Sequence, residues 1–301
     1  MILVGAETVT LPSGIWTGED HHREIELCPV RGKDVEELSQ MLRPKPLAAR
    51  ATHLLSRCVC RLGSMEGVTA EMMRSLTVGD REAILLALRK LTLGNRIDCV
   101  LKCPAAVCGE QMDLELSVDA LLLDPYGDVR SEYEVRLERG DKGYLVRFRL
   151  PTGADQERAA VLLEKGGQER ATDFLLHQCI REVALDDRAA DAAPLEEWPA
   201  FISRTMPGIM AEHDPQAEVM LDVTCPACGQ RFQTLFDTAS YFFSELGCNS
   251  EQLYREVHRL ALHYKWSEAD ILSMSVPKRR LYLNLLEESF ASGGDHEQFP
   301  G

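Results

Sequence analysis

Long apolar runs and an excess of basic charge are both missing from this sequence. No apolar stretch approaches the roughly 18 residues of a membrane-spanning helix, and the opening Met1–Gly5 run lacks the basic leader of a secretory signal. Lys and Arg number 33 against 48 Asp and Glu, a net charge of −15. We therefore expect no membrane partner and no unspecific binding of nucleic acid, because anionic lipid and phosphate would both be repelled.

Catalytic signatures are also missing. The sequence has no glycine loop with a phosphate-binding lysine, no dinucleotide fingerprint and no nucleophile elbow. No acid, base and nucleophile can be named as a convergent set. We therefore expect a protein that is not an enzyme and has no small-molecule substrate.

Cysteine, by contrast, is plentiful. Ten cysteines without a dense framework, in a chain of 301 residues, are typical of a reducing compartment, so we expect the cytoplasm. Buried free thiols are the expected state of five that lie among apolar neighbours: Cys28, Cys58, Cys99, Cys179 and Cys248.

Two further cysteine pairs stand at matching places in the two halves of the chain. The first reads Cys103-Pro-Ala-Ala-Val-Cys108-Gly and the second reads Cys225-Pro-Ala-Cys228-Gly. We call each of these turns a knuckle. A cysteine pair followed by glycine at a hairpin tip can direct two thiolates at one zinc ion, because glycine permits the turn and backbone amides favour the negative sulfurs.

A closed structural zinc site needs four ligands, and each knuckle supplies two. The simplest completion is one structural Zn²⁺ shared by Cys103, Cys108, Cys225 and Cys228, although 116 residues lie between the two knuckles. Two separate metal ions, or hairpin turns without metal, are the alternatives. Redox-active thiols are a third, but the proline after each first thiol and the matched second pair favour zinc. Cys99 aligns with a leucine of the second half and is expected in the core.

The knuckles belong to a longer self-similarity. The segments REIELCPVRGKDVEEL (23–38) and ATHLLSRCV (51–59) precede the first knuckle, and YLVRFRLPTGADQERA (144–159) and TDFLLHQCI (172–180) precede the second. These matches keep the same order and nearly the same spacing. They predict two copies of one unit, a duplication of a whole domain rather than a solenoid of short modules.

Each unit is predicted to open with an alternating β-hairpin, at residues 15–28 and 133–150. The first unit then has a helix from Thr77 to Gly94. In the second unit Pro199 and Pro207 fall in the equivalent stretch, so that helix is expected to be short or kinked.

These patterns predict an α+β fold with two tandem repeats of hairpin, helices and knuckle hairpin, joined in a zinc-ribbon-like site. The repeats are expected at residues 1–123 and 124–246. A helical segment unlike either unit follows at 247–291, and a disordered tail at 292–301.

Two stretches resemble a known family. The stretch LTVGDREAILLALRKLTLGNRIDCVLKCP (76–104), with the early Leu11-Pro-Ser-Gly, resembles the T-even-type phage baseplate hub family and the baseplate-associated proteins of extracellular contractile injection systems. The stretch EVHRLALHYKWSEADILSMSVPKRRLYLNLL (256–286) is similar to a segment of the larger, two-copy members. The resemblance spans about residues 8–290. It implies a non-enzymatic protein with other baseplate and tail proteins as partners.

The leading hypothesis is therefore a structural or assembly component of a contractile phage-like tail or injection system, in the cytoplasm or incorporated in the particle. One alternative is an assembly chaperone that is absent from the finished particle. Another is a zinc-ribbon adaptor that binds nucleic acid or a transcription complex, although the net charge and the sparse basic and aromatic residues argue against it.

Overall fold

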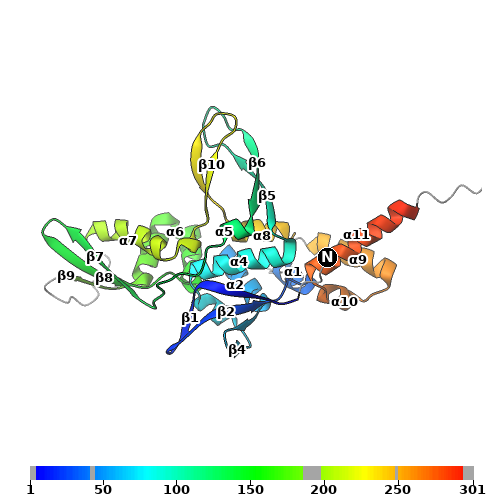
Figure 1. The fold of residues 1–301 in the computed structure, drawn as a ribbon, viewed down its shortest axis with the longest axis horizontal. Helices are drawn as coiled ribbons and strands as arrows, with labels where there is room; N and C mark the ends of the chain where they lie inside the picture. The colour runs from blue at the N-terminus through cyan, green and yellow to red at the C-terminus, as the bar shows by residue number, and fades with distance from the viewer. Residues whose placement is uncertain (1–4, 41–44, 186–197, 248–249, 294–301) are drawn as a thin grey trace, which may run out of the picture.

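The computed structural model describes residues 5–40, 45–185, 198–247 and 250–293, and it has an α+β fold. Its strands form small antiparallel sheets in the orders β1-β2-β3-β4, β5-β6, β7-β8-β9 and β10-β11. The molecule is elongated, with a central body, a second body at one end, a helical group at the other, and an arm that projects from the middle (Figure 1). In these described ranges no helix has the length and apolar character needed to cross a membrane.

The central body, which we call the first body, packs four helices against the four-stranded sheet. Its elements are β1 (Glu7–Thr17), β2 (Asp20–Leu27), α1 (Gly32–Ser39), α2 (Leu47–Cys58), β3 (Val59–Leu62), β4 (Met65–Glu66), α3 (Ala70–Ser75) and α4 (Val78–Leu93). Helix α4 is buried on nearly every side, since it contacts β1, α2, α8 and α11. It begins at Thr77, whose hydroxyl accepts the Asp80 amide, and ends at Gly94 with a φ of 95°. The predicted helix between these two residues is confirmed.

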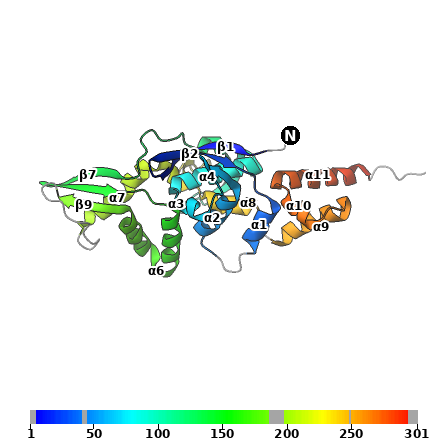
Figure 2. The same cartoon turned by 90° about the horizontal axis from the view of Figure 1, so that it is seen from below.

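The second body is smaller and lies at one end of the molecule (Figure 1). It contains β7 (Tyr133–Arg139), β8 (Lys142–Phe148), α6 (Gly153–Cys179), β9 (Ile180–Leu185), α7 (Ala200–His213) and the 3-10 helix η2 (Pro215–Ala217). Gly167, at a φ of 81°, breaks α6 into two helical arms that diverge in Figure 2. The apolar side chains of the sheet pack against α6 and α7 in a separate core.

Helix α7 differs from the expectation of a short helix. It runs for 14 residues without a break, through Pro207. Pro207 and Gly208 both lie on the exposed side of the helix. Because proline has no amide hydrogen, the carbonyl four residues earlier has no hydrogen-bond donor within the helix. Water can reach this carbonyl on the exposed side, which lowers the free-energy cost of proline in the helix.

The arm consists of two β-hairpins that lie side by side (Figure 1). The first is β5 (Arg96–Lys102) with β6 (Gln111–Ser117), which leads into α5 (Val118–Leu121), and the second is β10 (Met220–Thr224) with β11 (Arg231–Leu235). Inward-facing side chains such as Ile97, Met112, Leu221 and Val223 form a core of their own. The arm is thus a small face-to-face pair of hairpins, with a knuckle at the tip of each.

The C-terminal helices complete the first body. They are α8 (Thr238–Glu245), α9 (Ser250–Tyr264), α10 (Glu268–Ser273) and α11 (Val276–Gly293). Phe242, Leu253 and Ile271 join the same core as α2 and α4. Helices α9 and α10 also pack against α1. Both predicted opening hairpins are present, and residues 294–301 of the predicted tail lie outside the described residues.

Candidate metal centre

Each knuckle is a tight turn closed by the same backbone contacts. The Cys103 amide donates to the Glu110 carbonyl at 2.8 Å, and the Cys225 amide donates to the Gln230 carbonyl at 2.9 Å. In both turns the glycine after the second cysteine has a positive φ, 61° in the first and 73° in the second. A side chain would strain that conformation, which explains the Cys-Gly pair in each knuckle.

The two knuckles bring their four thiols together. The Sγ atoms of Cys103 and Cys228 are 3.7 Å apart, and those of Cys108 and Cys225 are 3.8 Å apart. All four sulfur atoms lie within 4.8 Å of one another. Tetrahedral coordination at a zinc–sulfur distance of about 2.3 Å places sulfurs about 3.8 Å apart. The arrangement therefore fits a four-coordinate metal ion, and the sequence-predicted residues meet in one group.

Local electrostatics act in opposite directions on the thiols of Cys225 and Cys103. The backbone amide of Cys228, helped by the amide of Ala227, outweighs burial and lowers the pKa of Cys225 to about 7. At Cys103 the Ala105 amide favours the thiolate, but burial and the three neighbouring thiols outweigh it and raise the pKa to about 12. Thiols this close cannot all ionise without a cation, and metal binding would release their protons.

The remaining cysteines lie elsewhere. Cys58 and Cys179 are buried free thiols, as expected. Cys99, also expected in the core, is instead a half-buried free thiol on β5, outside the four-thiol group. The expectation of a free thiol at Cys28 is wrong, because Cys28 forms a disulfide with Cys60. Strands β2 and β3 pair at this point, which brings the two Cα atoms to 6.2 Å. Cys248 lies outside the described residues.

A buried polar joint connects the two bodies below the arm. The Asp214 carboxylate, at the end of α7, accepts the Gly79 amide of α4 at 2.9 Å and the Tyr126 hydroxyl at 3.1 Å. That hydroxyl in turn accepts the Gln216 amide at 2.8 Å. A Cβ at Gly79 would collide with the Asp214 carboxylate, so only glycine permits this contact.

The N-terminal end of α4 also forms hydrogen bonds with strand β1. The Asp80 carboxylate accepts the amides of Ser13 and Gly14 at 2.8 and 2.9 Å. Burial raises the pKa of Asp80 to about 7, although these amides favour the charged form and Asp214 adds a smaller repulsion. Burial also raises the pKa of Asp214. No pattern in the sequence indicates this joint, because Gly79-Asp80 is an ordinary helix start and the partners of these residues lie 66 and 135 positions away.

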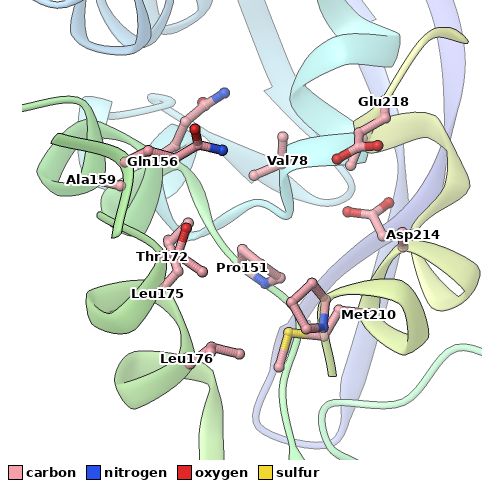
Figure 3. Close-up of a pocket in the computed structure, with 14 residues that line it drawn as sticks. Val78, Pro151, Gln156, Ala159, Thr172, Leu175, Leu176, Met210, Asp214 and Glu218 are labelled. Atoms are coloured by element: carbon pink, nitrogen blue, oxygen red, sulfur yellow. The ribbon is translucent and has the colours of Figure 1, made fainter. Parts of the chain in front are cut away.

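An apolar cavity of about 490 Å³ lies beside the joint, between α6, α7 and the start of α4. In Figure 3, Leu175 and Leu176 of α6 lie on one side of it, while Asp214 and Glu218 lie on the other. The described residues that line it include no Cys, His, Lys or Arg. Its polar side chains are carboxylates, amides and the Thr172 hydroxyl.

No curated protein and no solved structure matches the chain. A family model described as "T4 bacteriophage base plate protein" matches residues 17–244, which include the second body, the first body from β2 to α4, and all four clustered cysteines. Proteins of this family are typically structural and non-enzymatic, and other baseplate proteins are their partners. The chain belongs to the T4 bacteriophage base plate protein family.

Proposed function

We propose that this protein is a non-enzymatic structural or assembly component of the baseplate of a phage-like contractile tail or injection system. In this proposal one Zn²⁺, held by Cys103, Cys108, Cys225 and Cys228, joins two related units. The observation that carries it is the meeting of four thiols from two distant knuckles in a chain of the baseplate family.

Several matched details support the two units being copies of each other. In each, a β-hairpin leads to a helix whose third residue is an aspartate that accepts the backbone amide of the residue before the helix: Asp34 accepts the Arg31 amide in α1, and Asp155 accepts the Thr152 amide in α6. In each, the chain then reaches a helix that ends in a buried cysteine and passes directly into a strand, β3 or β9. The Cys58 carbonyl accepts the Cys28 amide at 2.8 Å, and the Cys179 carbonyl accepts the Arg149 amide at 2.9 Å.

A metal ion at the knuckles would act mechanically. Bound Zn²⁺ would supply four strong bonds to thiolates and would take no part in a reaction. Structural zinc in small domains contributes about 10–16 kcal/mol of apparent binding free energy. The arm core between the hairpins is small, so closure of its tip would fix one hairpin against the other. Since one hairpin comes from each predicted unit, this closure would limit how the units move relative to each other.

Metal content tests the site directly. We expect one zinc per chain in protein purified without chelator, and its loss in Cys225→Ser. The matched control is Cys99→Ser, because Cys99 is a half-buried free cysteine on the same arm but outside the four-thiol group. Two ions per chain, none, or equal loss in both variants would count against the shared site.

The role in assembly needs a separate experiment. Deletion of the gene should abolish assembly of complete particles, and complementation with the intact chain should restore it. Mass spectrometry of intact particles against cell lysate then separates a permanent subunit from an assembly chaperone, since only a subunit stays in the purified particle. Normal assembly without the protein would contradict both roles.

A further inference from the structure

The C-terminal helices are attached to α1 by a short backbone contact. The Gly32 amide donates to the Met274 carbonyl at 3.1 Å, and the Val276 amide donates back to the Val30 carbonyl at 2.8 Å. The two segments thus form one antiparallel bridge between the start of α1 and the turn from α10 to α11. We call such a reciprocal pair of hydrogen bonds a clasp.

An identical clasp joins α6 to the first body. Here the Gly153 amide donates to the Leu76 carbonyl at 3.0 Å, and the Val78 amide donates back to the Pro151 carbonyl at 3.1 Å. This clasp lies between the start of α6 and the turn from α3 to α4. In both cases a helix that begins with glycine is held at the turn between a six-residue helix and a long one.

The helices that begin at the two clasps share a further pattern. Both begin Gly-x-Asp-x-Glu, and in each the aspartate accepts the backbone amide of the residue before the helix at 2.8 Å. The glutamate contacts the partner helices in each: Glu36 accepts the Tyr254 hydroxyl of α9 at 2.7 Å, and Glu157 accepts the Thr52 hydroxyl of α2 and pairs with Arg74 of α3. The same three positions are therefore used at both clasps.

The helix groups that receive these segments also correspond. We call α2–α3–α4 the first acceptor module and α9–α10–α11 the second. In each, a capping residue starts the six-residue helix, Thr69 or Ser267, and eight positions later another hydroxyl residue, Thr77 or Ser275, starts the long one. This correspondence revises the expectation that the C-terminal segment is unlike the rest of the chain.

A buried arginine lies at the same position of each module, four residues after the second hydroxyl residue. Arg81 is 1% exposed and Arg279 is 3% exposed. Arg81 donates to the Ala48 carbonyl of α2 at 2.9 Å, and Arg279 donates to the Glu256 carboxylate of α9 at 2.8 Å. Each arginine thus connects the third helix of its module to the first helix. These hydrogen bonds hold its guanidinium group in place.

These arginines occupy the space beside the clasp glycines. A Cβ at Gly153 would lie 2.6 Å from Arg81 Nη1, and a Cβ at Gly32 would lie 2.8 Å from Arg279 Nη1. We propose that α9–α11 is a recognition module built like α2–α4, and that both modules select an extended segment leading into a Gly-x-Asp-x-Glu helix through the buried arginine. In this chain α1 is the segment bound by the second module, and α6 is the segment bound by the first.

The test uses full-length protein and follows amide hydrogen exchange helix by helix. Gly32→Ala should raise exchange at least about tenfold, or about 1.4 kcal/mol, in α1 and α9–α11 while α6 keeps its protection. Gly153→Ala should do the reverse. The matched control is Gly208→Ala, also at a helical glycine, where no atom lies within 4 Å of an added Cβ. It should leave exchange in all these helices unchanged.

Double variants separate recognition from simple destabilisation. In the double variant Gly153→Ala with Arg81→Ala, the loss of protection should be clearly smaller than the sum of the losses in the two single variants. The reason is that the shortened side chain at position 81 makes room for the new methyl group. At Gly32 the relief by Arg279→Ala should be smaller, since the Leu272 backbone also lies 3.0 Å from the added Cβ. Tyr254→Phe is a milder probe, which should raise exchange in α1 and α9 about twofold to tenfold.

Four results would overturn the proposal. One is exchange in the glycine variants equal to that of Gly208→Ala. Another is strict additivity of Gly153→Ala and Arg81→Ala. The third is a loss of protection in either glycine variant that spreads equally over both modules. The fourth is unchanged exchange in α1 and α9 of Tyr254→Phe. None of these readouts depends on metal, so the proposal can fail while the shared zinc site stands.

Discussion

The two halves of this protein are nearly alike at the knuckles and very unequal in their bodies. Both knuckles close with the same backbone hydrogen bond and the same left-handed glycine. Among the described residues, however, the first body has 29 buried apolar residues in one core, whereas the second has 12. The meeting of four thiols at one point allows little variation in the sequence of the knuckles. A hydrophobic core needs only burial and adequate packing, so its size and composition can differ between the bodies. We therefore expect the stability of the second body to depend more on its contacts with the rest of the protein.

Removal of the proposed zinc ion should produce the largest effect, because this ion would bind the two knuckles, the feature that the halves share. With chelator we expect exchange in β10 and β11 to rise by several orders of magnitude, since about 10–16 kcal/mol of apparent binding free energy is lost. The sheet β1–β4, whose core is separate from the arm, should keep its protection. Hydrogen exchange with and without chelator measures this. Equal loss in both regions would show that the arm does not unfold independently.

The unequal cores predict unequal responses to the same substitution. Phe148 of the second body and Phe242 of the first-body core are both 0% exposed. Phenylalanine to alanine in a core costs about 3–5 kcal/mol. Phe148→Ala should unfold the second body at low urea in a separate early transition, whereas Phe242→Ala should shift the main transition. Urea titration followed by exchange in β8 and α4 checks this. A single shared transition in both variants would mean that the bodies unfold as one unit.

The joint between the bodies should respond to pH. Asp80 and Asp214 have raised pKa values in the folded protein, mainly through burial. The folded state then binds more protons than the unfolded state between the ordinary carboxyl pKa of about 3.9 and the Asp80 value of about 7, so stability contributed by this joint falls as pH rises through that window. Asp155 behaves oppositely: contacts with Arg149 and Thr152 outweigh burial and lower its pKa, so its contribution is lost as pH falls.

Urea midpoints at pH 5 and pH 8 measure this effect, which we expect to be about 1–3 kcal/mol because each pKa unit is worth about 1.4 kcal/mol. Asp80→Asn removes one titrating group at a fixed size and should reduce the slope, while Asp214 and Glu82, whose pKa values burial also raises, keep part of it. Asp155→Asn should leave that slope in place. An Asp80→Asn variant with the original slope would place the titration elsewhere.

Local patterns account for what the sequence predicted correctly. The hairpins, the helix between Thr77 and Gly94 and the meeting of Cys103 with Cys228 all follow from alternation, capping or metal-ligand spacing. The parts that sequence analysis missed depend on tertiary contacts. Pro207 is tolerated because its face of α7 is exposed, and Gly79 is required because Asp214 packs against it. Neither condition can be read from the neighbouring residues.

A deletion in the first knuckle should produce the smallest effect. Its two additional residues, relative to Cys225-Pro-Ala-Cys228, form an outward loop in which Val107 is 99% exposed. Deletion of Ala106 and Val107 would leave Cys103-Pro-Ala-Cys-Gly, the sequence of the second knuckle.

We expect metal content and arm protection to remain within about twofold of the original values, because the shorter turn can close by an amide-to-carbonyl bond like that from Gly229 to Cys225, which is 2.9 Å long. Deletion of two residues within β5 is the matched control, because it would draw the first knuckle back along the arm by about 6.6 Å and remove the metal. Loss of metal in the knuckle deletion would show that the longer turn is needed to bring Cys108 to the shared site. The two knuckles would then be complementary rather than equivalent.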